Sequence, residues 1–172
     1  MFTAGRKRAR VILLLAAILL LDQGTKLIVD RTIPLYRSIP VIEGWFDLTH
    51  ARNTGAAFGL LAGERRAVGS FILIVFSLAA VGFIIHLLRR LVETDTGLIL
   101  SLTFILAGAL GNLIDRVFYG EVIDFLDVYW NGYHWPAFNV ADSFITVGAV
   151  LCLWFLMRTK GRDPFAPRSP TA

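Results

Sequence analysis

Two aspartates, Asp124 and Asp142, stand on either side of a short polar connection between the last two membrane-length apolar stretches. Carboxylates at membrane depth are costly, and those that persist there usually have a function. Two carboxylates held close together cannot both ionise easily, so one keeps a proton while the other acts as a base. Such a pair can activate water and polarise a carbonyl group, which is the chemistry that peptide hydrolysis needs. Two alternatives stay open from spacing alone: Asp142 as a simple helix cap, and Asp127 in place of Asp124.

Other residue types offer weaker catalytic sites. The histidines, His50, His86 and His134, are far apart and form no HExxH or similar zinc pattern. Ser143 has no obvious histidine or lysine base; Lys26 is on the same side of the membrane, but a serine–lysine pair has little support. We therefore expect neither a metal nor another cofactor, and a metal-dependent membrane hydrolase is the nearest chemical alternative.

The composition predicts a membrane protein. Of the 172 residues, 56% are hydrophobic and only 17% are charged, which is below the charge content of a soluble domain. Four apolar runs, at residues 11–29, 67–88, 98–116 and 140–157, each approach the roughly 20 residues that cross the hydrocarbon core. The sequence therefore predicts one membrane-embedded domain over residues 1–172, an all-α bundle of four transmembrane helices.

The placement of basic residues predicts the orientation of these helices. Lysines and arginines cluster before the first run and after the second and fourth runs. With four spans these clusters share one side, and positive charge marks the cytoplasmic side. Both termini are therefore predicted in the cytoplasm, and the pattern favours a membrane over a nucleic acid as partner. The basic start also resembles a signal peptide, but the first run continues to Val29 without a cleavage site, which favours a retained helix.

Two outer segments separate the spans. Residues 30–66 contain the alternating stretch Phe46–His50, which predicts a small β-sheet on the membrane surface with Trp45 near the headgroups. Residues 119–138 are rich in aromatics, as expected at an interface, and predict a short connecting helix or loop. Together the two segments could close over a bound peptide as a lid. A tail over residues 162–172 is predicted to be disordered.

The chain order brings nearly all costly polar groups to the outer membrane face. Asp22 and Lys26 have the i, i+4 spacing of a helical ion pair. Asp115 and Arg116 would form a second charged pair at a helix end, with Asn112 one turn earlier. Ionisable groups of this kind also mark transporters and proton pathways, but those spread them across the membrane thickness, whereas here they cluster at one face.

Five blocks in order make the chain resemble lipoprotein signal peptidase (signal peptidase II), a bacterial membrane aspartic peptidase. The blocks cover residues 22–26 (DQGTK), 53–59 (NTGAAFG), 108–116 (GALGNLIDR), 120–125 (GEVIDF) and 138–143 (FNVADS). The resemblance implies Asp124 and Asp142, not Asp127, as the catalytic dyad. It also implies substrate-binding or supporting roles for Asn53, Gly55, Asn112, Arg116, Asn139, Asp22, Lys26 and Asp115.

The same resemblance implies a substrate and a location. The substrate would be a diacylated prolipoprotein, cut just before its lipidated cysteine so that the signal peptide is released. The enzyme would sit in the bacterial inner membrane as a multi-pass protein, with its active site at the outer face. We expect a monomer.

Overall fold

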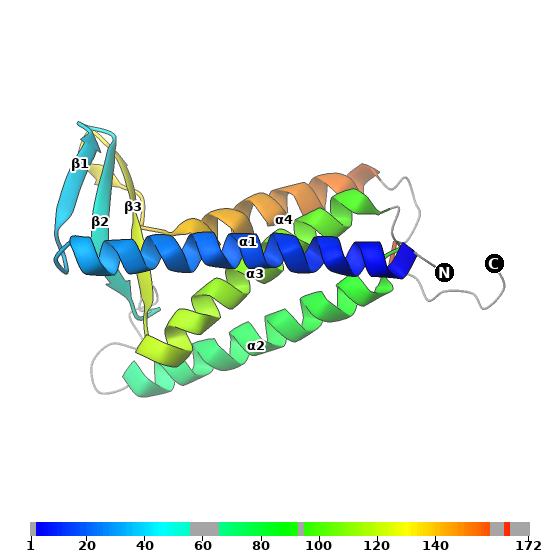
Figure 1. Cartoon of the computed structure of the whole chain (residues 1–172). Helices are drawn as coiled ribbons and strands as arrows, with labels where there is room; N and C mark the ends of the chain where they lie inside the picture. The colour runs from blue at the N-terminus through cyan, green and yellow to red at the C-terminus, as the bar shows by residue number, and fades with distance from the viewer. Residues whose placement is uncertain (1–2, 56–65, 93–94, 159–163, 166–172) are drawn as a thin grey trace.

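The computed structural model describes residues 3–55, 66–92, 95–158 and 164–165. Its four helices are α1 (Thr3–Thr32), α2 (Arg66–Arg90), α3 (Thr96–Tyr119) and α4 (Val140–Arg158). All four are long and apolar enough to cross a membrane, which confirms the predicted spans. They run lengthwise beside one another, and a small sheet lies across one end of the bundle (Figure 1). Most of the tail predicted to be disordered lies outside the described residues, but Phe165 within it packs against the helical core.

Helix α3 occupies the centre of the bundle. Its apolar residues form a buried cluster with α2 that includes Val81, Leu88 and Leu102. Toward α4 its backbone approaches closely, because a Cβ atom placed on Gly108 would lie 2.3 Å from the carbonyl oxygen of Ala141. Small residues at such positions permit the close helix packing that stabilises membrane bundles. The helices of the bundle are therefore positioned around α3.

The sheet at this end of the bundle has four antiparallel strands in the order β1-β2-β3-β4. They are β1 (Ser38–Ile42), β2 (Phe46–Asn53), β3 (Val122–Trp130) and β4 (Tyr133–His134). The expectation of a helix or loop over residues 119–138 was wrong, because β3 and β4 fill most of that segment. Its β-branched and aromatic residues favour a strand once β2 supplies a partner. Residues 30–66 and residues 119–138 therefore both contribute strands to one sheet.

The two faces of the sheet have different neighbours. On one face, Ile123 and Phe125 of β3 form a buried cluster with Val29 of α1 and with Ile33, the residue that follows this helix. Because side chains alternate along a strand, Asp124 between them points to the opposite face. Gly120 ends α3 in the left-handed conformation, with φ of 75°, and turns the chain into β3. The sheet thus presents an apolar face to α1 and a polar residue to the other side.

Candidate active site

Asp124 is buried in β3 and receives two side-chain hydrogen bonds. Asn53 Nδ2 donates to its Oδ2 at 2.9 Å, and Asn139 Nδ2 donates to its Oδ1 at 2.7 Å. In the β2–β3 register, Asp124 lies opposite Ala51. Asn53 is two residues after Ala51, so its side chain is on the same face of the sheet and reaches Asp124. Pairing of β2 with β3 therefore brings the first outer segment to this carboxyl group.

Asp142 lies in the first turn of α4 and forms a reciprocal cap with Asn139. The backbone N–H of Asp142 donates to Asn139 Oδ1 at 2.9 Å, and the backbone N–H of Asn139 donates to Asp142 Oδ2 at 3.2 Å. This is the geometry of a capping box, which satisfies backbone donors that the helix leaves open. Asp142 therefore does take part in capping helix α4, as the helix-cap alternative predicted. Its other carboxyl oxygen, however, accepts a hydrogen bond from Asn112 Nδ2 at 2.7 Å.

Asn139 connects the two aspartates. Its side-chain amide donates to Asp124 while its backbone N–H donates to Asp142. The position of Asn139 follows from an isolated β-bridge between Leu126 and Phe138, which returns the chain alongside β3 immediately before α4 begins. Two carboxyl groups eighteen positions apart in the sequence are thereby held against a single residue, Asn139.

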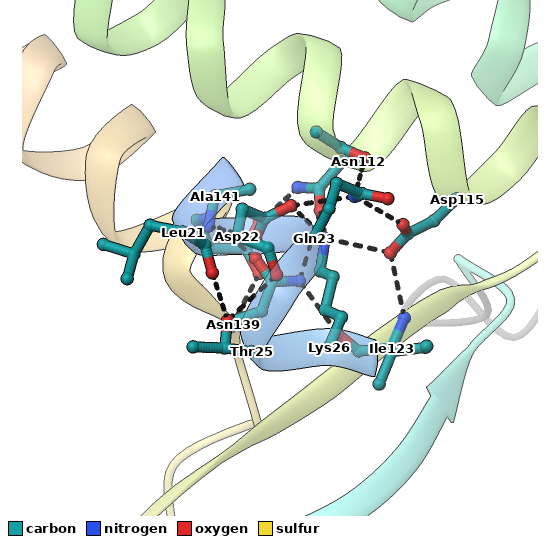
Figure 2. Close-up of polar contacts among 12 residues, drawn as sticks. Leu21, Asp22, Gln23, Thr25, Lys26, Asn112, Asp115, Ile123, Asn139 and Ala141 are labelled. Atoms are coloured by element: carbon teal, nitrogen blue, oxygen red, sulfur yellow. Dashed lines mark hydrogen bonds and ion pairs between the residues drawn. The ribbon is translucent and has the colours of Figure 1, made fainter. Parts of the chain in front are cut away.

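Behind this pair lies a buried ionic network centred on Lys26 (Figure 2). The Lys26 ammonium lies 2.8 Å from Asp22 Oδ2, 2.9 Å from Asp115 Oδ2 and 3.2 Å from Asn112 Oδ1. These three acceptors match the three N–H donors of an ammonium group. The predicted Asp22–Lys26 pair is confirmed. The predicted Asp115–Arg116 pair was wrong, because neighbouring helical residues point in different directions and Asp115 faces Lys26 on α1.

The network also joins α1 to the start of α4. Asp22 Oδ1 accepts the backbone N–H of Ala141 at 2.9 Å. This contact requires a close approach, since a Cβ atom on Gly111 of α3 would lie 2.5 Å from Asp22 Oδ2. Asp115 Oδ2 similarly accepts the backbone N–H of Ile123 in β3, at 3.3 Å. The buried carboxylates therefore hold both elements that carry Asp124 and Asp142.

Arg116 lies beside the two aspartates without a direct ion pair to either. Its Nη1 donates weakly to the carbonyl of Asn112 at 3.4 Å. Its buried Nε has no hydrogen-bond partner among the described residues. The guanidinium interacts electrostatically with Asp142, Asp124 and Asp115. A buried donor of this kind is available to a ligand that enters the site.

Burial sets the protonation of Asp124. It raises the pKa of the Asp124 carboxyl group from 3.8 to about 6, and the charge of Asp142 contributes in the same direction. Hydrogen bonds from Asn53 and Asn139 and the charge of Lys26 oppose this increase. The pKa of Asp124 therefore lies well above that of an ordinary aspartate, a perturbation that is common at functional sites.

Gly55 supports the site through Asn53. The Gly55 backbone N–H donates to Asn53 Oδ1 at 2.8 Å, which leaves the amide nitrogen of Asn53 facing Asp124. Gly55 has φ of +76°, and a Cβ atom there would lie 2.1 Å from Leu73 Cδ1. Both constraints favour glycine. Phe58 and Gly59, from the same sequence block, lie outside the described residues.

Comparisons with known proteins show which family this chain belongs to. The family model of signal peptidase (SPase) II matches residues 14–158. A lipoprotein signal peptidase of Geobacter sulfurreducens is 53% identical over 144 residues, covering 84% of this chain and 89% of that protein. The chain belongs to the signal peptidase II family. It is therefore a multi-pass bacterial membrane protein and a peptidase of the aspartic class.

Further similarities cover most of the chain. A lipoprotein signal peptidase of Desulforapulum autotrophicum is 46% identical over 158 residues, covering 92% of this chain and 98% of its own. A solved bacterial membrane enzyme superimposes with a TM-score of 0.77 at 30% identity, covering 94% of this chain and 95% of that one. A second gives a TM-score of 0.72 at 36% identity, covering 88% and 94%. The signal peptidase II fold thus accounts for the bundle and the sheet together.

The signal peptidase II site contains one residue that the sequence analysis missed. Gln23 Nε2 donates to Asp115 Oδ1 at 2.9 Å and lies 3.1 Å from Asp22 Oδ2, so it bridges the two carboxylates around Lys26. It stands inside the DQGTK block, but only the packing of α1 against α3 shows its partners. In the part of the chain that the structure describes, no three His, Cys, Asp or Glu side chains are grouped as a metal site would need.

Proposed function

We propose that this peptidase removes the signal peptide from diacylglyceryl-modified prolipoproteins, cutting just before the lipidated cysteine, with Asp124 and Asp142 as its catalytic pair. One observation carries the proposal: Asn139 donates to both carboxylates and so holds them together where α4 begins beside the sheet. The names of the relatives support a lipoprotein substrate. The basic clusters support cytoplasmic termini and an outer-face site.

The surroundings of the two carboxyl groups support different roles. Asp142 accepts hydrogen bonds from Asn112 and from a backbone N–H, and it lies in the first turn of α4. In both contacts a carboxyl oxygen of Asp142 is the acceptor, which is the role that a base also plays toward a water proton. Asp124 is buried, which favours its neutral form. We therefore assign the base to Asp142 and the acid to Asp124 in the resting enzyme.

The cleavage then follows from these two protonation states. Asp142 takes a proton from water while the water oxygen bonds to the scissile carbonyl carbon, and Asp124 gives its proton to the carbonyl oxygen. In the second step of the reaction, Asp142 donates the proton that it took from water to the leaving nitrogen as the C–N bond breaks. A hydroxyl proton of the collapsing gem-diol returns to Asp124, which restores the starting state.

The location of the site suits a lipid-anchored substrate. The diacyl chains of the cysteine stay in the bilayer, so the scissile bond is presented near the outer hydrocarbon boundary. The sheet that carries Asp124 lies across one end of the bundle (Figure 1), and the basic clusters favour that end as the outer one. Arg116, whose buried Nε lacks a partner among the described residues, would donate to a carbonyl of the bound peptide.

The test is cleavage of a diacylated prolipoprotein by purified Asp124→Asn and Asp142→Asn enzymes. Each variant should lose at least about 10³-fold in kcat, since both proton transfers depend on the pair. The matched control is Asp127→Asn, which removes a carboxylate on the same strand that contacts the exposed His134. It should retain activity. Full activity of Asp142→Asn would defeat the mechanism.

Two further arms test the substrate and the absence of a cofactor. The same prolipoprotein without the diacylglyceryl group should be cleaved far more slowly if the lipid positions the scissile bond. Activity should persist after treatment with a chelator, because two carboxylates suffice to activate water. Loss of activity in chelator, restored by a divalent metal, would favour the metal-dependent alternative.

A further inference from the structure

A polar cavity lies on the face of the sheet away from Asp124. Its volume is about 450 Å³, and its lining includes Asp30 and Leu35 near the end of α1, Arg52 of β2, Tyr119 of α3 and Glu121. Arg52 lies opposite Ile123 in the β2–β3 register, on the face that α1 covers. This cavity is therefore separate from the catalytic pair.

Groups of both charge signs line this cavity. The Arg52 guanidinium forms an ion pair with Asp30 through Nη2, and its Nε lies 4.0 Å from Glu121 Oε1. The same Nε donates to His50 Nε2 at 3.2 Å. The aromatic ring of Tyr119 lies 5.8 Å from the guanidinium carbon. Two carboxylates and one guanidinium in a shared hollow match a ligand that carries both a cation and an anion.

The cavity lies at the membrane boundary. Asp30 follows Lys26 by one helical turn on α1, and Tyr119 follows Asp115 by one turn on α3, so both lie just outside the buried ionic network. Each belongs to the last turns of a helix that crosses the membrane. Nearer the middle of these spans, Ile28 is 62% exposed and Phe118 is 75% exposed. Apolar side chains exposed on a transmembrane helix face lipid acyl chains.

We propose that this cavity binds the zwitterionic headgroup of a phospholipid whose cation is a primary ammonium, as in an ethanolamine phospholipid. The ammonium would donate to the carboxylates of Asp30 and Glu121, and the phosphate would accept from the guanidinium N–H groups of Arg52. The acyl chains would extend along the exposed apolar surface of α1 and α3. This inference rests on the membrane-spanning fold and not on the proposed cleavage reaction.

The test measures lipid binding to the full-length protein by native mass spectrometry from detergent micelles. Three lipids with identical acyl chains are compared: phosphatidylethanolamine, its N-acetylated form, which lacks the cation, and phosphatidylglycerol. We expect phosphatidylethanolamine to bind about tenfold more tightly than either, the effect of one charge-assisted hydrogen bond. Equal binding of phosphatidylethanolamine and its N-acetylated form would overturn the proposal without relying on any variant.

Variants then locate the site. Asp30→Asn combined with Glu121→Gln should abolish the preference for the ammonium headgroup, whereas Glu43→Gln, an exposed carboxylate outside the cavity, should preserve it. Thermal unfolding of each variant checks that the fold is intact. A preference that survives in the folded double variant would place the lipid elsewhere and overturn the assignment. Equally tight binding of soluble glycerophosphoethanolamine would identify a free headgroup as the ligand and overturn the lipid assignment.

Discussion

The side-chain amide of Asn112 donates to Asp142 at 2.7 Å, and Lys26 determines which end of that amide faces the carboxylate. Asn112 Oδ1 accepts from Lys26 Nζ and from Asn139 Nδ2, both at 3.2 Å. If the amide turned over, its NH2 group would face an ammonium and a second amide nitrogen, which have only donors to offer. A positive charge on α1 thereby presents an N–H donor to an aspartate on α4.

This relationship predicts the effect of Asn112→Asp. The new carboxylate keeps the acceptor that Lys26 needs but replaces the donor to Asp142 with a negative charge. We expect the protein to remain folded while kcat falls by about 10²-fold or more, because Asp142 loses a hydrogen-bond donor and gains a like charge beside it. Steady-state kinetics that separate kcat from KM, together with a thermal unfolding curve, check both parts.

Lys26→Met is the complementary variant. It leaves Asp22 and Asp115 buried without their shared cation, and breaking a buried ion pair costs about 3–5 kcal/mol. The control, Asp127→Asn, removes the contact with His134, whose side chain is 53% exposed, so its cost should stay below about 1 kcal/mol. Comparable unfolding midpoints for the two variants would show that the Lys26 network does not stabilise the fold.

The pKa of Asp124 predicts how activity depends on pH. If protonated Asp124 is the acid, kcat/KM should fall as the pH rises above about 6, the value to which burial raises this pKa. The pH profile of kcat/KM between acid and mildly alkaline conditions measures this basic limb, whose apparent value belongs to the interacting pair. A flat profile above pH 6, with chemistry limiting the rate, would contradict the acid role.

The same shift predicts a change in stability with a definite sign. Between 3.8 and about 6 the folded state holds the Asp124 proton that the unfolded state has released. The stability contributed by this group is therefore greatest below the unfolded pKa and is lost as the pH rises toward the folded pKa. Chemical unfolding of the wild type and of Asp124→Asn across this window should show the wild type losing more stability with increasing pH.

Asn53→Ala should move the basic limb to higher pH. The hydrogen bond from Asn53 lowers the pKa of Asp124, so its removal lets that pKa rise further. The direction distinguishes this role from a general loss of structure, which would lower the rate without shifting the limb upward. Ser38→Ala, on the exposed strand β1, provides a sheet variant that should leave the profile unchanged.

Two glycines should respond oppositely to alanine. Gly108→Ala places a Cβ atom 2.3 Å from the Ala141 backbone carbonyl oxygen, so α3 and α4 must separate, at a cost of about 1–3 kcal/mol. Gly82→Ala on α2 meets nothing within 4 Å and should be neutral or stabilising by up to about 1 kcal/mol, as alanine favours helix. Thermal unfolding midpoints in one detergent compare them directly. Similar losses at both positions would argue against close packing of α3 on α4.

Much of this protein could be predicted from local patterns in its sequence. The four spans follow from the length of apolar runs, and the Asp22–Lys26 ion pair follows from their i, i+4 spacing. Both depend on residues near one another in the chain, whose relative positions a helix determines by itself. The five polar blocks predicted the family for the same reason. The residues of each block are close together in the sequence, so the block can be recognised without knowing how the helices pack.

Only the tertiary structure decided how these pieces meet. Asp115 pairs with Lys26, not with its neighbour Arg116, because helix α1 brings an ammonium to the buried side of α3. The segment after α3 becomes strand β3 because β2 is there to pair with it, and Asn139 contacts both aspartates because a bridge to β3 returns the chain. Contacts between residues far apart in the sequence depend on which elements pack together, and no local periodicity encodes that choice.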